Sequence, residues 1–160
     1  MASELNVHIR VDVLEPQELT AQEQQAMKMA QEAANNAYAP YSNFLVGAAL
    51  VLDDGSISIG SNQENAAYPS GLCAERTALF ALSAQHPHAK IKLLAVTARR
   101  RHEQEHLPAM PCGACRQVMS EYEFKQKEPI PVLLQAANGK FYRFQNVADL
   151  LPFQFTPEHL

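Results

Sequence analysis

Cys73-Ala-Glu75 and Pro111-Cys112-Gly-Ala-Cys115 are the two stretches that decide how this chain of 160 residues must fold. A Cys-x-x-Cys pair at a helix start places two thiolates on one metal ion, and a thiolate from another helix start adds a third ligand. Three ligands leave the fourth tetrahedral position open for water, which distinguishes a catalytic zinc from a structural one. We therefore predict one Zn²⁺ per chain, bound by Cys73, Cys112 and Cys115.

Charged residues beside these cysteines fit the same chemistry. Glu75 lies two residues after Cys73, where its carboxylate can lean over the open metal position and move protons. The alternative is a glutamate that only complements the helix dipole. Zinc with three thiolates carries net negative charge, so we expect Arg76 and Arg116 to donate hydrogen bonds to the sulfurs. The alternative for both is a place on the surface of an amphipathic helix.

The composition is that of an ordinary globular protein, with 47% hydrophobic and 19% charged residues, and the length fits one domain. The longest apolar run, Phe44–Leu52, is far shorter than the ~20 residues of a membrane-spanning helix. A net charge of −4 argues against a nucleic-acid partner. Three cysteines, an odd number, and no visible secretory signal lead us to expect a cytoplasmic protein without a membrane partner.

Around the cysteine motifs, the apolar pattern predicts alternating strands and helices. Thr20 and Glu23 form a capping box for an alanine-rich helix that ends before Pro40 and packs closely on a sheet. The further predicted elements are strands Val46–Leu52 and Ser56–Gly60 joined by a turn at Asp54-Gly55, a helix Cys73–Ala84, a strand Leu93–Ala98, a helix from Pro111 to near Glu123, strands Pro131–Gln135 and Lys140–Gln145, and a short helix Val147–Leu151. This order predicts an α/β fold: a three-layer α/β/α sandwich around a mixed five-stranded sheet, formed by one domain of residues 20–160.

Two segments fall outside this pattern. Residues 1–19 are expected to form an N-terminal arm in which Asn6–Val13 alternates as a short strand does, and the sequence assigns this arm no function. Arg99–Met110 is expected to be a charged, solvated loop. Its basic run Arg99-Arg-Arg101 leaves phosphate binding as the alternative.

Several blocks of sequence occur together in a fixed order, and a set of blocks is more specific than one motif. They are Ala39-Pro-Tyr41-Ser-Asn-Phe44, Val46-Gly-Ala-Ala-Leu50, Asn62-Gln-Glu64-Asn65-Ala-Ala-Tyr68, Cys73-Ala-Glu75-Arg76-Thr-Ala, Pro111-Cys112-Gly-Ala-Cys115-Arg116-Gln, and Leu150-Leu-Pro152 with Phe155 and Pro157-Glu158. With these blocks, residues 38–160 resemble the small zinc-dependent cytidine deaminases, the homotetrameric type with three cysteine ligands.

The resemblance implies a role for each matching position. Cys73, Cys112 and Cys115 match the zinc ligands, Glu75 the proton shuttle, Asn62 and Glu64 the pair that holds the ribose, Phe44 the ring that stacks on the pyrimidine, the Ala74 backbone the group that reads the base, and Phe155 an aromatic side chain contributed to a neighbouring subunit's pocket, while Tyr68 lies at the end of the ribose-binding segment. The alternatives are turn formation for Asn62 and Glu64 and apolar packing for Phe44 and Phe155. The resemblance also implies a homotetramer with active sites completed across the interface.

The activity implied by the resemblance is hydrolytic deamination of cytidine and 2′-deoxycytidine to uridine and 2′-deoxyuridine, with release of ammonia, in pyrimidine salvage. One alternative is a related deaminase acting on a modified nucleoside or a nucleoside antibiotic. A second is a structural zinc module that binds a partner protein, although such sites are closed by a fourth ligand that the sequence does not offer nearby. A redox role for Cys112 and Cys115 leaves Cys73-Ala-Glu75 unexplained.

Overall fold

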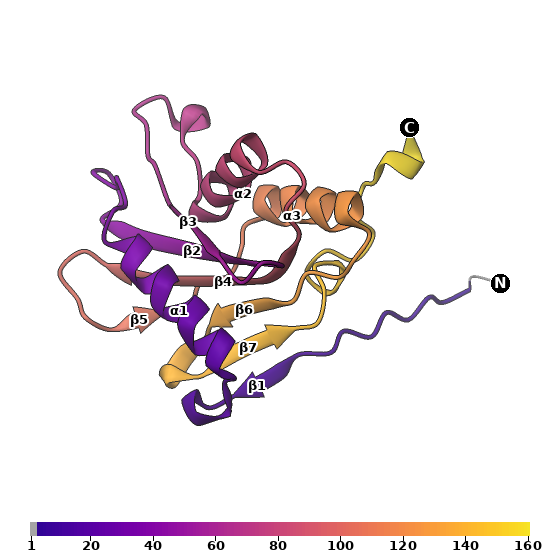
Figure 1. Ribbon diagram of the computed structural model, residues 1–160, viewed down its shortest axis with the longest axis horizontal. Helices are drawn as coiled ribbons and strands as arrows, with labels where there is room; N and C mark the ends of the chain where they lie inside the picture. Colours follow the sequence, from indigo (N-terminus) through magenta and orange to yellow (C-terminus); the bar gives the residue numbers. More distant parts are fainter. Residues whose placement is uncertain (1–2) are drawn as a thin grey trace.

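A mixed sheet of seven strands runs through the computed structural model, which describes residues 3–160 (Figure 1). Six strands follow the order β1-β7-β6-β4-β2-β3, and the short strand β5 pairs with β4 beside this path. Their bounds are β1 Asp12–Leu14, β2 Phe44–Leu52, β3 Ile57–Ser61, β4 Ile91–Arg100, β5 His106–Leu107, β6 Val132–Gln135 and β7 Phe141–Phe144. Neighbouring strands are antiparallel except β4 and β6, which pair in parallel.

The sheet has two strands more than the five predicted from the sequence. β1 lies in the predicted arm, but pairing is confined to Asp12–Leu14 because its partner β7 is only four residues long. The alternating residues 6–11 therefore lie outside any strand. β5 lies inside the predicted loop and is two residues long, too short for alternation to reveal. It can form because β4 continues to Arg100, beyond the predicted end at Ala98.

Three α-helices cover the sheet: α1 Ala21–Ala34, α2 Ala74–Gln85 and α3 Gly113–Gln126. α2 and α3 lie side by side on one face, and α1 lies on the other (Figure 1). The predicted capping box starts α1: Thr20 Oγ1 accepts a hydrogen bond from the Glu23 amide at 3.2 Å, and the Glu23 carboxylate accepts one from the Thr20 amide at 2.8 Å. The three-layer α/β/α architecture is therefore confirmed.

Two large apolar clusters, one on each face of the sheet, form most of the core, and a third, small cluster joins Ala34, Ala39 and Leu45. In β6, Val132 and Leu134 belong to the cluster beneath α2 and α3, whereas Leu133 between them belongs to the cluster beneath α1. All three side chains are fully buried. This alternation is the pattern expected for a central strand covered on both faces.

Small residues let both helical layers approach the sheet closely. A Cβ atom at Gly47 in β2 would collide with the carbonyl oxygen of Ala30 in α1. A Cβ atom at Gly60 in β3 would lie 2.5 Å from the backbone nitrogen of Ala78 in α2. The close packing predicted for the alanine-rich helix is thus confirmed. On the opposite face, the missing side chain of Gly60 lets α2 approach the sheet in the same way.

Short turns and an extended arm complete the chain. Five single 3-10 turns lie at Pro16–Glu18, Tyr68–Ser70, Ala137–Gly139, Ala148–Leu150 and Pro157–His159, so the short helix predicted at 147–151 is one such turn. Residues 3–11 run away from the body as an extended segment (Figure 1). Within residues 3–160, no helix combines the length and the apolar character that a membrane span requires.

Candidate active site

The three cysteines meet where α2 and α3 begin. Cys73 is the N-cap residue of α2 and Cys112 that of α3, while Cys115 lies in the first turn of α3. The sulfurs of Cys73 and Cys112 are 3.9 Å apart, and those of Cys112 and Cys115 are 3.5 Å apart. All three Sγ atoms lie within 4.8 Å of one another. The fold therefore joins two motifs that are 39 residues apart in the sequence.

This cluster fits a zinc ion. A tetrahedral ion with Zn–S bonds of about 2.3 Å holds its sulfurs about 3.8 Å apart, close to the spacing observed between the thiols. The side chains differ in exposure: Cys115 is buried, Cys73 is half-buried and Cys112 is exposed. Both helix starts direct their positive ends at the sulfurs, which favours thiolate. Three sulfur ligands would leave one position of a tetrahedral ion open for water.

Protons are shared unequally among the sulfurs before a metal binds. A hydrogen bond from Cys115 and the nearby Arg76 guanidinium, opposed by burial, bring the pKa of Cys73 to about 5. The same bond, given by Cys115 to the Cys73 thiolate, raises the pKa of Cys115. Because zinc binds thiolates, metal binding must displace the remaining protons, and the affinity for zinc should rise with pH.

Only one of the two predicted arginines reaches the sulfurs. Arg76 Nη2 donates to Cys73 Sγ at 3.7 Å, as predicted. Arg116 instead donates from Nε to the Pro111 carbonyl at 2.9 Å and from Nη1 to the Leu150 carbonyl at 3.0 Å. Helix position does not distinguish the two, since Arg76 is three residues after Cys73 and Arg116 is four residues after Cys112. The difference lies in the acceptors: the carbonyls of Pro111 and Leu150 take the donors of Arg116. Arg116 therefore ties the start of α3 to the C-terminal part of the chain.

Glu75 is buried beside the cysteines, with 4% of its surface exposed. Burial, reinforced by the negative charge of Cys73, raises the pKa of the Glu75 carboxyl. A carboxyl whose pKa is moved toward neutrality can both accept and return a proton at physiological pH. Its burial beside the cysteines, rather than on the surface of the first turn of α2, makes Glu75 a candidate for proton transfer and not only a partner of the helix dipole.

A cavity of about 640 Å³ opens in front of this cluster, within the size range of small-molecule sites. Its wall comes from the loop before β2, the start of β2, the segment after β3, the starts of α2 and α3, and Met110. The lining residues are Tyr41, Ser42, Phe44, Val46, Asn62, Gln63, Glu64, Asn65, Tyr68, Gly71, Leu72, Cys73, Glu75, Arg76, Met110 and Cys112. Sequence reasoning did not assign Ser42, Gln63 or Met110 to the site. Adjacency offered the only signal, since Ser42 lies in a quoted block and Met110 precedes Pro111.

Asn62 and Glu64 face this cavity and bind the backbone that surrounds it. Asn62 Oδ1 accepts from the Val46 amide at 2.8 Å, and Asn62 Nδ2 donates to the Phe44 carbonyl at 2.9 Å. A side-chain amide carries two N–H groups, so one remains for a ligand. The Ser42 hydroxyl and the surrounding backbone donors lower the pKa of Glu64, which favours a carboxylate that can accept from a ligand hydroxyl.

The aromatic residues predicted for the site differ in where they lie relative to the cavity. Phe44 lies on its wall. Tyr68, 77% exposed, meets Tyr41 edge to face with ring centroids 6.1 Å apart. Phe155 lies outside the cavity, 57% exposed and stacked on His159. Its backbone carbonyl accepts a hydrogen bond from Gln117 of α3 at 2.8 Å, which fastens the C-terminal segment to this helix.

Ala74 contributes its backbone to the site, and not its side chain. It is the first residue of α2 and its side chain is fully buried. The first amides of an α-helix have no partner within the helix, so the Ala74 N–H is a donor at the cluster end of α2.

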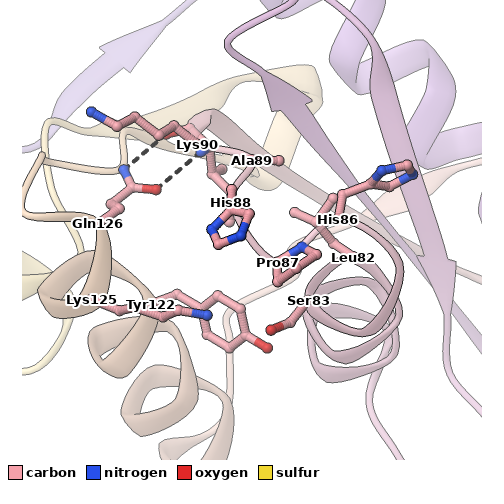
Figure 2. A pocket seen from close by; sticks show the side chains of 11 residues that line it. Leu82, Ser83, His86, Pro87, His88, Ala89, Lys90, Tyr122, Lys125 and Gln126 are labelled. Carbon is pink, nitrogen blue, oxygen red and sulfur yellow. Dashed lines mark hydrogen bonds between the residues drawn. The ribbon is translucent and has the colours of Figure 1, made fainter.

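A second cavity of about 230 Å³ lies at the opposite ends of the same helices, where α2 and α3 finish (Figure 2). His88, Tyr122 and Lys125 are among its lining residues, and none of the eleven is a cysteine or a carboxylate. Helix C-termini carry partial negative charge, the opposite of the environment around the cysteines. The residues with catalytic chemistry thus belong to the larger cavity.

Known proteins with similar sequences include bacterial cytidine deaminases. The family model of the cytidine and deoxycytidylate deaminase zinc-binding region matches residues 20–127. The cytidine deaminase of Halalkalibacterium halodurans is 40% identical over 137 residues, covering 86% of this chain and 96% of the relative. That of Sporosarcina psychrophila is 43% identical over 129 residues, covering 81% and 88%.

Solved structures agree with the sequence relatives. The crystal structure of cytidine deaminase from Burkholderia pseudomallei matches with a TM-score of 0.71 at 41% identity, covering 86% of this chain and 100% of the other. Cytidine deaminase from Mycobacterium tuberculosis matches with a TM-score of 0.64 at 33% identity, covering 82% and 95%. With its three-cysteine cluster at two helix starts, this chain belongs to the cytidine and deoxycytidylate deaminase family.

Proposed function

We propose that this protein catalyses the zinc-dependent hydrolytic deamination of cytidine and 2′-deoxycytidine to the corresponding uridines, releasing ammonia. The observation that carries the proposal is the placement of a buried glutamate, Glu75, beside three converging thiols at the base of a cavity large enough for a nucleoside. A structural zinc module is disfavoured, because such sites have four protein ligands and the cluster within residues 3–160 has three.

Cys73, Cys112 and Cys115 would hold the zinc ion. Bound there, zinc would make water a nucleophile at neutral pH. Glu75 accepts a proton from the water that attacks C4 of the pyrimidine and passes this proton to N3. It then takes the proton of the new C4 hydroxyl and gives it to the amine, so that the C4–N bond breaks, the C4 carbonyl forms and ammonia leaves. Arg76, bonded to Cys73, compensates part of the negative charge of the three thiolates.

Substrate recognition follows from the cavity wall. Glu64 accepts a hydrogen bond from the 3′-hydroxyl of the ribose, and Asn62 supplies its free N–H to the same sugar. Phe44 stacks on the pyrimidine, and the Ala74 amide reads the base. A nucleoside monophosphate should be a poor substrate, because its phosphate would approach the negative charge of Glu64.

The assembly we propose is a homotetramer in which Phe155 of each subunit completes a neighbouring pocket. The exposure of Phe153 and Phe155 supports it, since aromatic side chains in a terminal segment are usually covered in a functional assembly. Closed symmetric assemblies are also the usual form of soluble homo-oligomers. We expect the enzyme to act in the cytoplasm, where thiols stay reduced.

The test is ammonia release from cytidine, deoxycytidine, CMP, free cytosine and adenosine, with zinc measured in the same sample. Glu75→Gln should keep zinc and fold but lose at least about 10²–10⁴-fold in turnover, because one carboxyl group serves several proton transfers. Glu103 is exposed, so Glu103→Gln serves as the control and should have the turnover of the unmodified enzyme. Turnover of Glu75→Gln within tenfold of the unmodified enzyme would refute the assignment.

A further inference from the structure

Three consecutive arginines follow one another at the end of β4, and the structure gives each a different environment. Arg99 Nη2 donates to Asn35 Oδ1 at 2.6 Å, at the C-cap of α1. The Arg100 side chain is 63% exposed and its closest carboxylate is Glu103, at 3.9 Å. Arg101 turns back toward the loop that joins α1 to β2. The run is therefore not simply a solvated face, as its sequence suggested.

Arg101 holds both ends of the last part of that connection, residues 39–43, which we call the clasp loop. Its Nε donates to Asn43 Oδ1 at 3.1 Å, and its Nη2 donates to the Ala39 carbonyl at 3.2 Å. Its backbone amide also donates to the Asn43 carbonyl at 2.9 Å. Asn43 has φ +54°, a left-handed conformation that asparagine tolerates better than most residues. One guanidinium thus fixes where the clasp loop begins and ends.

The clasp loop in turn holds the carboxylate of Glu64. The amides of Tyr41 and Ser42 donate to Glu64 Oε2 at 2.9 and 3.3 Å. The Ser42 hydroxyl donates to Glu64 Oε1. Hydrogen-bond donors from a single loop of five residues therefore orient both carboxylate oxygens of Glu64. A shift of this loop would redirect Glu64 most directly, since the loop meets the other assigned residues through one contact each: the Phe44 amide donates to Ser42 Oγ, and Tyr41 packs on Tyr68.

We propose that Arg101 is a positioning residue that sets the selectivity for the sugar 3′-hydroxyl, because it clamps the clasp loop whose donors aim Glu64. The inference deepens the proposed function and rests on it. Arg101 itself lies outside the cavity lining, so it acts on Glu64 from a distance: through the loop, whose Ser42 hydrogen bond lowers the pKa of Glu64, and through its positive charge, which adds to that lowering. Phosphate binding by the arginine run is disfavoured, since Arg99 and Arg101 already donate to protein oxygens.

The experiment compares cytidine with 3′-deoxycytidine, which lacks only the hydroxyl that Glu64 is expected to bind. Values of kcat and KM are measured for both nucleosides with the zinc-loaded enzyme, Arg101→Met, Arg101→Lys and Arg100→Ala. Arg101→Met should raise KM for cytidine about tenfold, the lower bound for loss of a hydrogen bond to a charged group, with kcat unchanged. The KM for 3′-deoxycytidine should stay the same, so the selectivity falls by the same factor.

The other variants separate positioning from a general loss of structure. Arg101→Lys should recover part of the selectivity, because an ammonium can reach one of the two acceptors but cannot span both. Arg100→Ala should match the unmodified enzyme. The inference is overturned if Arg101→Met raises KM equally for both nucleosides, or if it leaves the selectivity unchanged. Either result would leave the proposed deaminase activity in place.

A second variant keeps the test decisive if Arg101→Met fails to fold. Asn43→Gly preserves the left-handed backbone but removes the acceptor of Arg101 Nε, so selectivity should fall by a smaller factor. Unchanged selectivity in this variant counts against the inference. The unmodified enzyme is measured first: if it turns over the two nucleosides equally, the sugar-binding role of Glu64 in the proposed function fails, and the inference fails with it.

Discussion

Replacement of Gly60 by alanine should damage both stability and catalysis through one steric contact. The new methyl group would lie 2.5 Å from the backbone nitrogen of Ala78 and 2.7 Å from the carbonyl oxygen of Ala74, both in α2. Ordinary contacts of a Cβ atom are 3.4–4 Å, so α2 must retreat from β3 by roughly 1 Å. The first turn of this helix carries Glu75, and Cys73 is its N-cap.

The expected magnitudes follow from that displacement. Overpacking costs about 1–3 kcal/mol, and a clash with helix backbone belongs at the upper end. About 3 kcal/mol corresponds to a decrease in Tm of roughly 6–12 °C for a chain of this size. A misplacement of 1 Å at a reacting group costs about 10²-fold in rate. Thermal unfolding and steady-state deamination of cytidine, both on zinc-saturated protein, measure the two effects.

Gly113→Ala is the matched control for stability. A Cβ atom there meets nothing within 4 Å, and the residue opens α3, so alanine should leave Tm unchanged or raise it through about 0.5–1 kcal/mol of backbone entropy. A Gly60→Ala protein with the Tm and turnover of the unmodified enzyme would show that α2 does not depend on this contact for its position.

Three further predictions concern metal, pH and assembly. Cys112→Ser should leave less than one zinc per chain after dialysis and lower Tm, since the metal links two helix starts; full occupancy by metal analysis would contradict the ligand assignment. The hydrogen bond from Arg143 lowers the pKa of Asp12, so this stabilisation is complete above the ordinary carboxyl pKa near 4 and is lost as the pH falls through the lower folded value. The difference in urea midpoint between the unmodified protein and Arg143→Met should therefore shrink between pH 6 and pH 3, and parallel curves would argue against the pair. Truncation after Pro152 should reduce activity but not zinc content, because Phe155 is removed; sedimentation and kinetics that showed a fully active monomer would place the whole pocket in one chain.

The layers and the metal cluster were predictable because each rests on local pattern. Capping at Thr20, the continuous apolar runs of β2 and β4, and the turn at Asp54-Gly55 are all set by neighbouring residues, and the structure confirms these elements. The spacing of the cysteines, at the starts of two predicted helices, was enough to predict that the three thiols would lie together. β5 could not be predicted, because a strand of two residues is too short to show an alternation of polar and apolar residues.

Roles that depend on where a long side chain ends could not be read from the sequence. Arg76 and Arg116 stand at similar places in similar motifs, yet only Arg76 reaches a sulfur, because the carbonyls of Pro111 and Leu150 take the donors of Arg116. Arg101 appeared to belong to a charged loop, but it binds a loop nearly 60 residues earlier in the chain. Such contacts depend on tertiary placement, which no window of sequence contains.

The pairing of β1 with β7 also fixes an order of assembly. α1, β2, β3, α2 and β4 all lie within residues 21–100, so they can pack as soon as that stretch has been synthesised. Asp12 leaves the ribosome before any of them, but Arg143, its partner, follows 131 residues later. The first strand to be made is thus the last to be paired, and the long loop that it closes adds little to the entropic cost of folding. The same edge, held by three residue pairs, should exchange its amide hydrogens before the central strands β2 and β4, which pair over nine positions.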